Sequence, residues 1–140
     1  MTALRTADQF LQDVVDWGER AIRHASSLSR EQFLADEKTQ DAVSRCIEAI
    51  GEAANRAARL DPSIKSSFPE FEVDRACAAR NVLSHDYFRA DPSVLWATVT
   101  QSIPKFVSDP KHIIEHRKRA SAQKQGGSDL VGGGRSDEPS

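Results

Sequence analysis

The stretch Gln40-Asp-Ala-Val-Ser-Arg-Cys-Ile-Glu-Ala-Ile-Gly-Glu-Ala-Ala54 decides the fold, because its apolar residues recur every three or four positions. This spacing is typical of an amphipathic α-helix and predicts one over residues 38–58. Gly51 costs about 1 kcal/mol of helix propensity relative to Ala, which packing has to offset. The inward face consists of Ala42, Val43, Cys46, Ile47, Ile50 and Ala54.

Two capping boxes mark helix starts before this stretch. Thr6 with Gln9 begins a helix over residues 7–26, and Ser29 with Gln32 begins a short one. In each box the two side chains satisfy backbone N–H groups that have no partner in the first turn. The apolar stripe of the first helix is Phe10, Leu11, Val14, Trp17, Ala21 and Ile22.

Helical spacing continues in the second half of the chain. Residues 61–69 read as a loop, and a further helix is expected from about Glu70. Asp91-Pro92 predicts another helix start, since Asp can cap and Pro is tolerated at the first helical position. Pro104 and Pro110 fall inside the apolar pattern of this last segment, so we expect a kink or break at each.

The apolar pattern ends near residue 120. Glycine-rich segments in 121–140 bury too little surface to offset the entropy of ordering, and they predict a disordered tail. The remaining residues 1–120 suit one domain. We therefore predict an all-α protein, an up-and-down bundle of four to five helices.

Composition narrows the class of protein. The formal net charge is −2, so no global field marks a nucleic-acid binder and any basic surface has to be local. The two cysteines fit buried apolar positions better than a disulfide framework. Neither a signal peptide nor a membrane-spanning run is recognised, which predicts a cytoplasmic protein without membrane contact.

The segment Arg80-Asn-Val-Leu-Ser-His-Asp-Tyr-Phe88 is the candidate chemical site. On a helix, Arg80 and His85 are separated by about 140° and lie within two turns. Histidine can exchange a proton near neutral pH, and arginine stabilises charge on phosphate oxygens. These roles suit cleavage of RNA by its own 2′-hydroxyl, although such residues also occur on ordinary helix surfaces. The reaction needs two proton transfers and the segment has one histidine, so a symmetric dimer would supply the second histidine.

This segment resembles the R-x4-H-x-Y motif of HEPN-domain proteins, and the chain as a whole is similar to the HepT-like toxins. The resemblance spans roughly residues 10–114 and includes 35–42, 50–54, 80–88 and Leu95-Trp96. Ala79 and Val73 depart from residues that many relatives carry, and both look like packing changes.

The resemblance implies a HEPN-like helical homodimer with metal-independent endoribonuclease activity and no cofactor, acting as the toxin of a toxin–antitoxin module. By the same resemblance Arg80 and His85 are catalytic, and Asn81, Ser84 and Tyr87 support them. The implied partners are an RNA substrate and a nucleotidyltransferase antitoxin of the MntA type. AMPylation of Tyr87 by that antitoxin would silence the toxin through bulk and negative charge.

Two other functions stay open at this point. The chain could be a non-catalytic HEPN binding partner of a nucleotidyltransferase, or a structural helical dimer in which Arg80 and His85 pair with carboxylates. The basic segment 105–119 fits either an RNA-backbone contact or a solvated helix end. His112 and His116 have metal-compatible spacing but no evident third ligand, which favours a surface pair.

Overall fold

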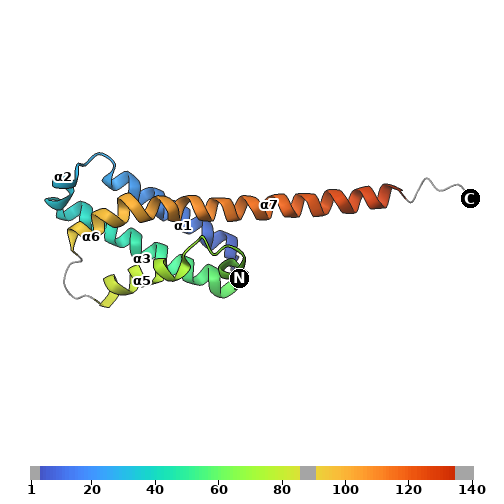
Figure 1. Ribbon diagram of the computed structural model, residues 1–140, viewed down its shortest axis with the longest axis horizontal. Helices are drawn as coiled ribbons and strands as arrows, with labels where there is room; N and C mark the ends of the chain where they lie inside the picture. Colours follow the sequence, from blue (N-terminus) through green and yellow to red (C-terminus); the bar gives the residue numbers. More distant parts are fainter. Residues whose placement is uncertain (1–3, 86–90, 135–140) are drawn as a thin grey trace, which may run out of the picture.

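The computed structural model describes residues 4–85 and 91–134 of the chain, with side chains over 4–79 and 91–124. All regular structure in these residues is helical, which confirms the predicted fold class. Long helices run alternately up and down, and the last projects beyond the others (Figure 1). In chain order the elements are α1 (Ala7–Ala25), α2 (Arg30–Leu34), α3 (Glu37–Leu60), α4 (Ser63–Ser67), α5 (Val73–His85), α6 (Pro92–Ala97), the π-helix η1 (Thr98–Ser102) and α7 (Ile103–Gly134).

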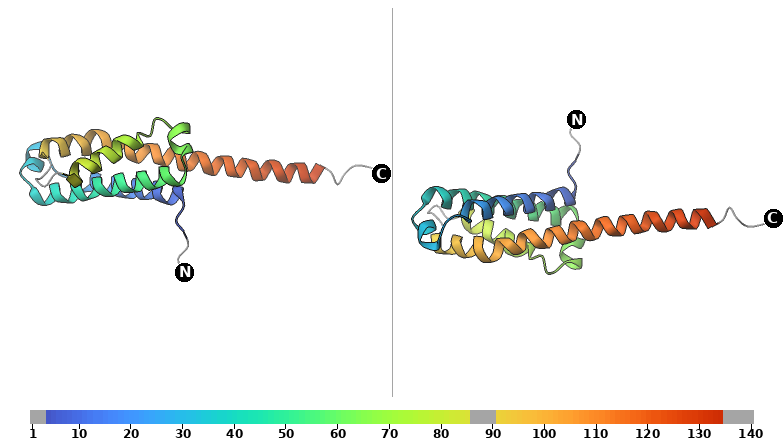
Figure 2. Two further views of the ribbon diagram at one scale, coloured as in Figure 1. Left: turned by 90° about the horizontal axis from the view of Figure 1, so that it is seen from below. Right: turned by 90° about the horizontal axis from the view of Figure 1, so that it is seen from above.

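Helix α3 occupies the middle of the bundle. It packs against α1 on one side and α5 on the other, and α7 packs against α1. The short helices α2 and α6 lie together at the end of the bundle that is remote from the projecting part of α7 (Figure 2). The up-and-down arrangement therefore places α5 next to α3.

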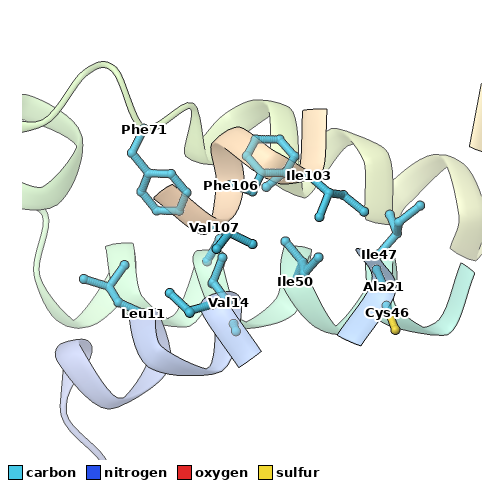
Figure 3. Packing of buried hydrophobic residues seen from close by; sticks show 14 of the residues in the cluster. Leu11, Val14, Ala21, Cys46, Ile47, Ile50, Phe71, Ile103, Phe106 and Val107 are labelled. Carbon is cyan, nitrogen blue, oxygen red and sulfur yellow. The ribbon is translucent and has the colours of Figure 1, made fainter. Parts of the chain in front are cut away.

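The core forms where the apolar stripes of these helices meet (Figure 3). At the centre of the core, Leu11, Val14 and Ile103 are all fully buried. Helix α1 comes very close to α7 at Gly18, where an added Cβ would lie 2.5 Å from Cγ2 of Val107. Only glycine permits this separation. The predicted stripes supply much of the buried set, including Leu11, Val14, Ala21, Val43, Cys46, Ile47, Ile50, Ala54, Leu95, Val99, Ile103 and Phe106.

Side-chain caps begin the helices where the sequence predicts them. Thr6 Oγ1 accepts from the backbone N–H of Gln9 at 3.2 Å, and Gln9 Oε1 accepts from the N–H of Thr6 at 2.9 Å. Ser29 and Gln32 form the same reciprocal pair. Asp91 caps α6, with Pro92 in its first turn. The capping side chains thus determine where these helices begin.

Four details differ from the sequence-based expectation. The predicted loop contains the one-turn helix α4, and α5 begins at Val73 rather than near Glu70. No break occurs at Pro110, which is buried inside a continuous α7. Before Pro104 the chain forms η1, where the N–H of Ile103 bonds to the carbonyl of Thr98. This wider turn relieves the clash between the proline ring and the preceding carbonyls, so the helix resumes.

The end of α7 runs past the start of the expected tail. The sequence predicts disorder from residue 121, whereas the backbone stays helical to Gly134. Residues 118–124 are all exposed, so this part of the helix gains no tertiary packing. Its hydrogen bonds are local and do not need an apolar stripe, which is why hydrophobic periodicity misses it. Residues 135–140 lie outside the described part.

Among the described residues, no helix combines the length and apolar character needed to cross a bilayer.

Candidate ribonuclease site

Helix α5 carries the predicted motif and is anchored to α3 along its first two turns. Val73 and Ala76 are buried in the core. The Cys77 thiol donates to the backbone carbonyl of Gly51, with 3.7 Å between sulfur and oxygen. This contact helps to fix the position of α5 against α3.

The motif occupies the last turns of this helix. The backbone remains helical through His85, so the part of the motif from Arg80 to His85 is helical as predicted. Residues four apart share a side of a helix, which places Arg80 and Ser84 in one row after Ala76. Asn81 and His85 follow Cys77 in the neighbouring row. The side chains of residues 80–85 lie outside the described ones, and so does Tyr87.

The surroundings of the motif are the α2–α6 end of the bundle. The rings of Phe33 and Trp96 pack with centroids 5.3 Å apart, which joins α2 to α6. Gln40 is almost fully buried and donates to the carbonyls of Phe33 and Leu34 at 2.9 and 3.2 Å. These contacts hold the short helices against α3. The end of α5 is directed toward this end of the bundle (Figure 1).

The acidic residues before α3 have a structural use. Asp36 caps α3, and its carboxylate accepts from the backbone N–H and the hydroxyl of Thr39 at 3.1 and 2.9 Å. These hydrogen bonds, the backbone one above all, hold the pKa of Asp36 below its usual value. Asp36 therefore serves as the N-terminal cap of α3.

The basic segment of α7 is largely engaged within the protein. Arg117 donates to Asp8 at 2.7 Å and also to Asp61, which ties α7 to α1 and to the end of α3. Lys111 pairs with Glu19 at 2.7 Å. A continuous RNA-binding face over residues 105–119 would require these cations to be available. The structure instead gives Arg117 and Lys111 the role of internal clamps.

His112 and His116 of α7 line the same surface hollow as Phe68. The ring of His116 packs edge-on against Phe68, with centroids 5.6 Å apart. Within the described ranges, no group of three His, Cys, Asp or Glu side chains is arranged to hold a metal ion.

Sequence reasoning missed one feature of the α1–α3 face. Trp17 is half-buried, and two guanidinium groups lie near its ring, with Cζ of Arg20 5.1 Å and Cζ of Arg45 5.4 Å from its centroid. Such cation–π contacts orient arginine side chains. Arg20 follows Trp17 by one helical turn and could have been paired with it on that basis. Arg45 comes from another helix, so its contribution is visible only in the fold.

Comparisons with known proteins agree with this architecture. The family described as ribonuclease HepT-like matches residues 5–113, which include the bundle and the whole of α5. The probable ribonuclease HepT of Thermococcus cleftensis is 35% identical over 100 residues, covering 71% of this chain and 88% of that protein. An RNase-named protein of Methanocaldococcus jannaschii is 27% identical over 111 residues, covering 79% and 89%. No solved structure matches the chain.

The helical bundle and these matches define the class first: the protein is a ribonuclease that cleaves within RNA. Because the family model matches residues 5–113, which is most of the chain, the chain belongs to the HepT-like ribonucleases.

Proposed function

We propose that this protein is the toxin of a toxin–antitoxin module, a metal-independent endoribonuclease that acts as a homodimer. Membership of the HepT-like family and a motif helix that is intact through His85 support the proposal. The second observation carries most weight, because the proposed roles require Arg80 and His85 to stay on one rigid element.

Arg80 and His85 are the proposed catalytic residues. The 2′-oxygen of the substrate attacks the adjacent phosphorus as an imidazole accepts its proton, and the bond from phosphorus to the 5′-oxygen breaks. A second imidazole, in its protonated form, donates a proton to the leaving oxygen. Arg80 stabilises the negative charge that builds on the phosphate oxygens in the transition state. Asn81 and Ser84 orient the substrate.

The homodimer is required by this proton balance. The motif of one chain contains a single histidine, His85, whereas the reaction uses one proton acceptor and one proton donor. Two chains related by a twofold axis would bring two copies of the motif to one groove. The absence of measurable dimer at the working concentration of an active enzyme would contradict this arrangement.

Regulation is proposed at Tyr87. A partner nucleotidyltransferase of the MntA type attaches AMP to the phenolic oxygen, and the added phosphate repels the RNA backbone in the groove. Co-expression with such an enzyme should raise the intact mass by AMP-sized increments. Tyr87→Phe should remove these increments and restore toxicity, and increments that persist in this variant would contradict the assignment.

The central experiment is an RNA cleavage assay with single variants of the motif. Arg80→Ala and His85→Ala should each lower the cleavage rate by about a hundredfold or more, the usual effect of losing a proton-transfer or charge-stabilising group. Arg75→Ala is the matched control, because Arg75 is an exposed arginine of the same helix that pairs with Glu72. If both motif variants cleave like the parent, the proposed site is wrong.

Toxicity provides the cellular counterpart. Expression of the parent should arrest growth, and each motif variant should lose this effect while keeping its helical content and dimer. A purified protein that is inert toward RNA yet binds a nucleotidyltransferase tightly would instead support a non-catalytic partner.

A further inference from the structure

The α1–α3 face carries two pairs of arginines that differ in one respect. Arg5 and Arg56 both lie over the ring of Phe10, at 4.6 and 5.7 Å from its centroid. Each is neutralised: Arg5 binds Asp13 at 2.6 and 2.9 Å, and Arg56 binds Glu52 at 2.9 Å. Their positive charge is therefore already balanced within the protein.

The second pair, Arg20 and Arg45, lies over Trp17. Both side chains are exposed, and neither forms a salt bridge or hydrogen bond with any residue in the described ranges. Their guanidinium groups keep a full set of N–H donors for an external anion. The contact with the indole ring limits the freedom of both side chains, which reduces the entropy lost on binding.

This pair also lies at the level of the motif. Helix α5 runs antiparallel to α3 and meets it where Cys77 contacts Gly51, so residues after Cys77 lie alongside residues before Gly51. Arg45 is among these and stands on the side of α3 that meets α1. The two features are therefore separated by about the width of one helix, roughly 10 Å. A chain leaving the motif across α3 would reach Arg45.

A shallow groove continues from Trp17 and Arg45 toward Phe10 between α1 and α3. Its volume is about 150 Å³. Small-molecule sites are usually of roughly 300–1,000 Å³, so the groove does not suit an enclosed ligand. Toward Phe10 the groove is lined by Arg5, Asp13, Glu52 and Arg56, whose charges are paired within the protein, so the contact for an external anion is at its Trp17 end.

We propose that Trp17, Arg20 and Arg45 form a secondary contact surface for single-stranded RNA, which guides the substrate over α3 toward the motif. The inference rests on the proposed function for the identity of the ligand. Proteins that bind single strands combine cationic groups for the phosphates with flat side chains on which bases stack. Here the guanidinium edges bind phosphates, and the indole and guanidinium planes offer stacking surfaces. No base-specific donor set is implied.

The test measures binding without cleavage. The probe is a short fluorescein-labelled 2′-O-methyl oligouridine, which lacks the free 2′-hydroxyl, and affinity is followed by anisotropy over a range of salt concentrations. The double variant Arg20→Gln/Arg45→Gln should bind about tenfold more weakly at low salt. Losing two phosphate contacts should also reduce the slope of log K against log salt by about 1.4.

The matched control is Arg5→Gln/Arg56→Gln, which removes the same charge from the same face. Because those arginines are neutralised by carboxylates, its affinity should stay within about twofold of the parent. Equal weakening by both double variants would show a general charge effect and overturn the proposal, as would unchanged binding by Arg20→Gln/Arg45→Gln. Circular dichroism checks that each variant keeps its helices.

Tryptophan fluorescence locates the contact. In a Trp96→Phe background, where Trp17 is the remaining tryptophan, the probe should quench the emission. Absence of quenching would overturn stacking at Trp17. If Arg20→Gln/Arg45→Gln binds RNA normally but loses a protein partner, the surface is a protein interface and the proposal fails. Failure of the parent to cleave RNA would refute the proposed function alone, since this assay reads binding.

Discussion

The contact between Gly18 and Val107 gives a prediction that can be worked from the structure. In Gly18→Ala the new Cβ would lie 2.5 Å from Cγ2 of Val107 and 3.5 Å from Cγ2 of Ile103. The first separation is far inside van der Waals contact, and a β-branched side chain on a helix has one strongly preferred rotamer. Val107 therefore cannot rotate away without strain.

The expected magnitude is the balance of two opposing effects. Overpacking a core contact costs about 1–3 kcal/mol, while replacing glycine by alanine in a helix gains about 1 kcal/mol. Gly18→Ala should therefore lower the free energy of unfolding by up to about 2 kcal/mol. Val107→Ala alone should cost about 1.6 kcal/mol through the loss of two methyl groups from a site that is 8% exposed.

A double-mutant cycle isolates the contact. Val107→Ala removes the atom that meets the new Cβ, so the double variant should be more stable than the sum of the single effects by at least about 1 kcal/mol. The assay is urea denaturation followed by circular dichroism. Strict additivity, or a Gly18→Ala variant more stable than the parent, would refute the claim that α1 and α7 touch at this point.

The remaining predictions concern polar contacts within the bundle. Gln40→Ala should lower the free energy of unfolding by about 1–3 kcal/mol in chemical denaturation, since it removes the hydrogen bonds to the carbonyls of Phe33 and Leu34 and leaves the first with only the N–H of Asp36. Arg117→Gln should cost about 1 kcal/mol or less, because Arg117 and Asp61 are both partly exposed. The pKa of Asp61 is lowered mainly by the hydrogen bond from Ser63 and also by that from Arg117. The ionised Asp61 therefore stabilises the fold at neutral pH, and a series of thermal melts should show this stabilisation being lost as the pH falls below about 4. Asp109 is the opposite case: burial raises its pKa, and its Oδ2 accepts no hydrogen bond among the described residues. Asp109→Asn should therefore be the more stable protein at pH 7, with the difference shrinking toward pH 4, and a gap that widens on acidification would contradict this sign.

Local signals in the sequence predict the helices well. Capping side chains such as Thr6 and Ser29 act within four residues of themselves, so their effect does not depend on the rest of the fold. The buried stripe of α3 is likewise periodic along one segment. Both kinds of signal are confirmed.

The features that could not be predicted depend on distant partners. Arg117 reads as one cation in a basic run, but it binds Asp8 and Asp61, which lie far away in the sequence. Arg45 meets Trp17 only because α1 and α3 are neighbours. For the candidate site, the sequence predicts the helix that carries Arg80 and His85, and the roles of these residues remain predictions.

The π-helical turn before Pro104 also sets the rotational phase of α7. A π-turn takes up one residue more than an α-turn does, so the two segments that it joins need not share one continuous apolar face. Here α6 can be directed to α2 while α7 is directed to α1. Deleting a single residue within 98–102 would let this turn become an ordinary α-turn, and the later side chains of α7 would keep nearly their present direction. The wide turn therefore absorbs the one residue that would otherwise rotate every later side chain of the last helix by about 100°.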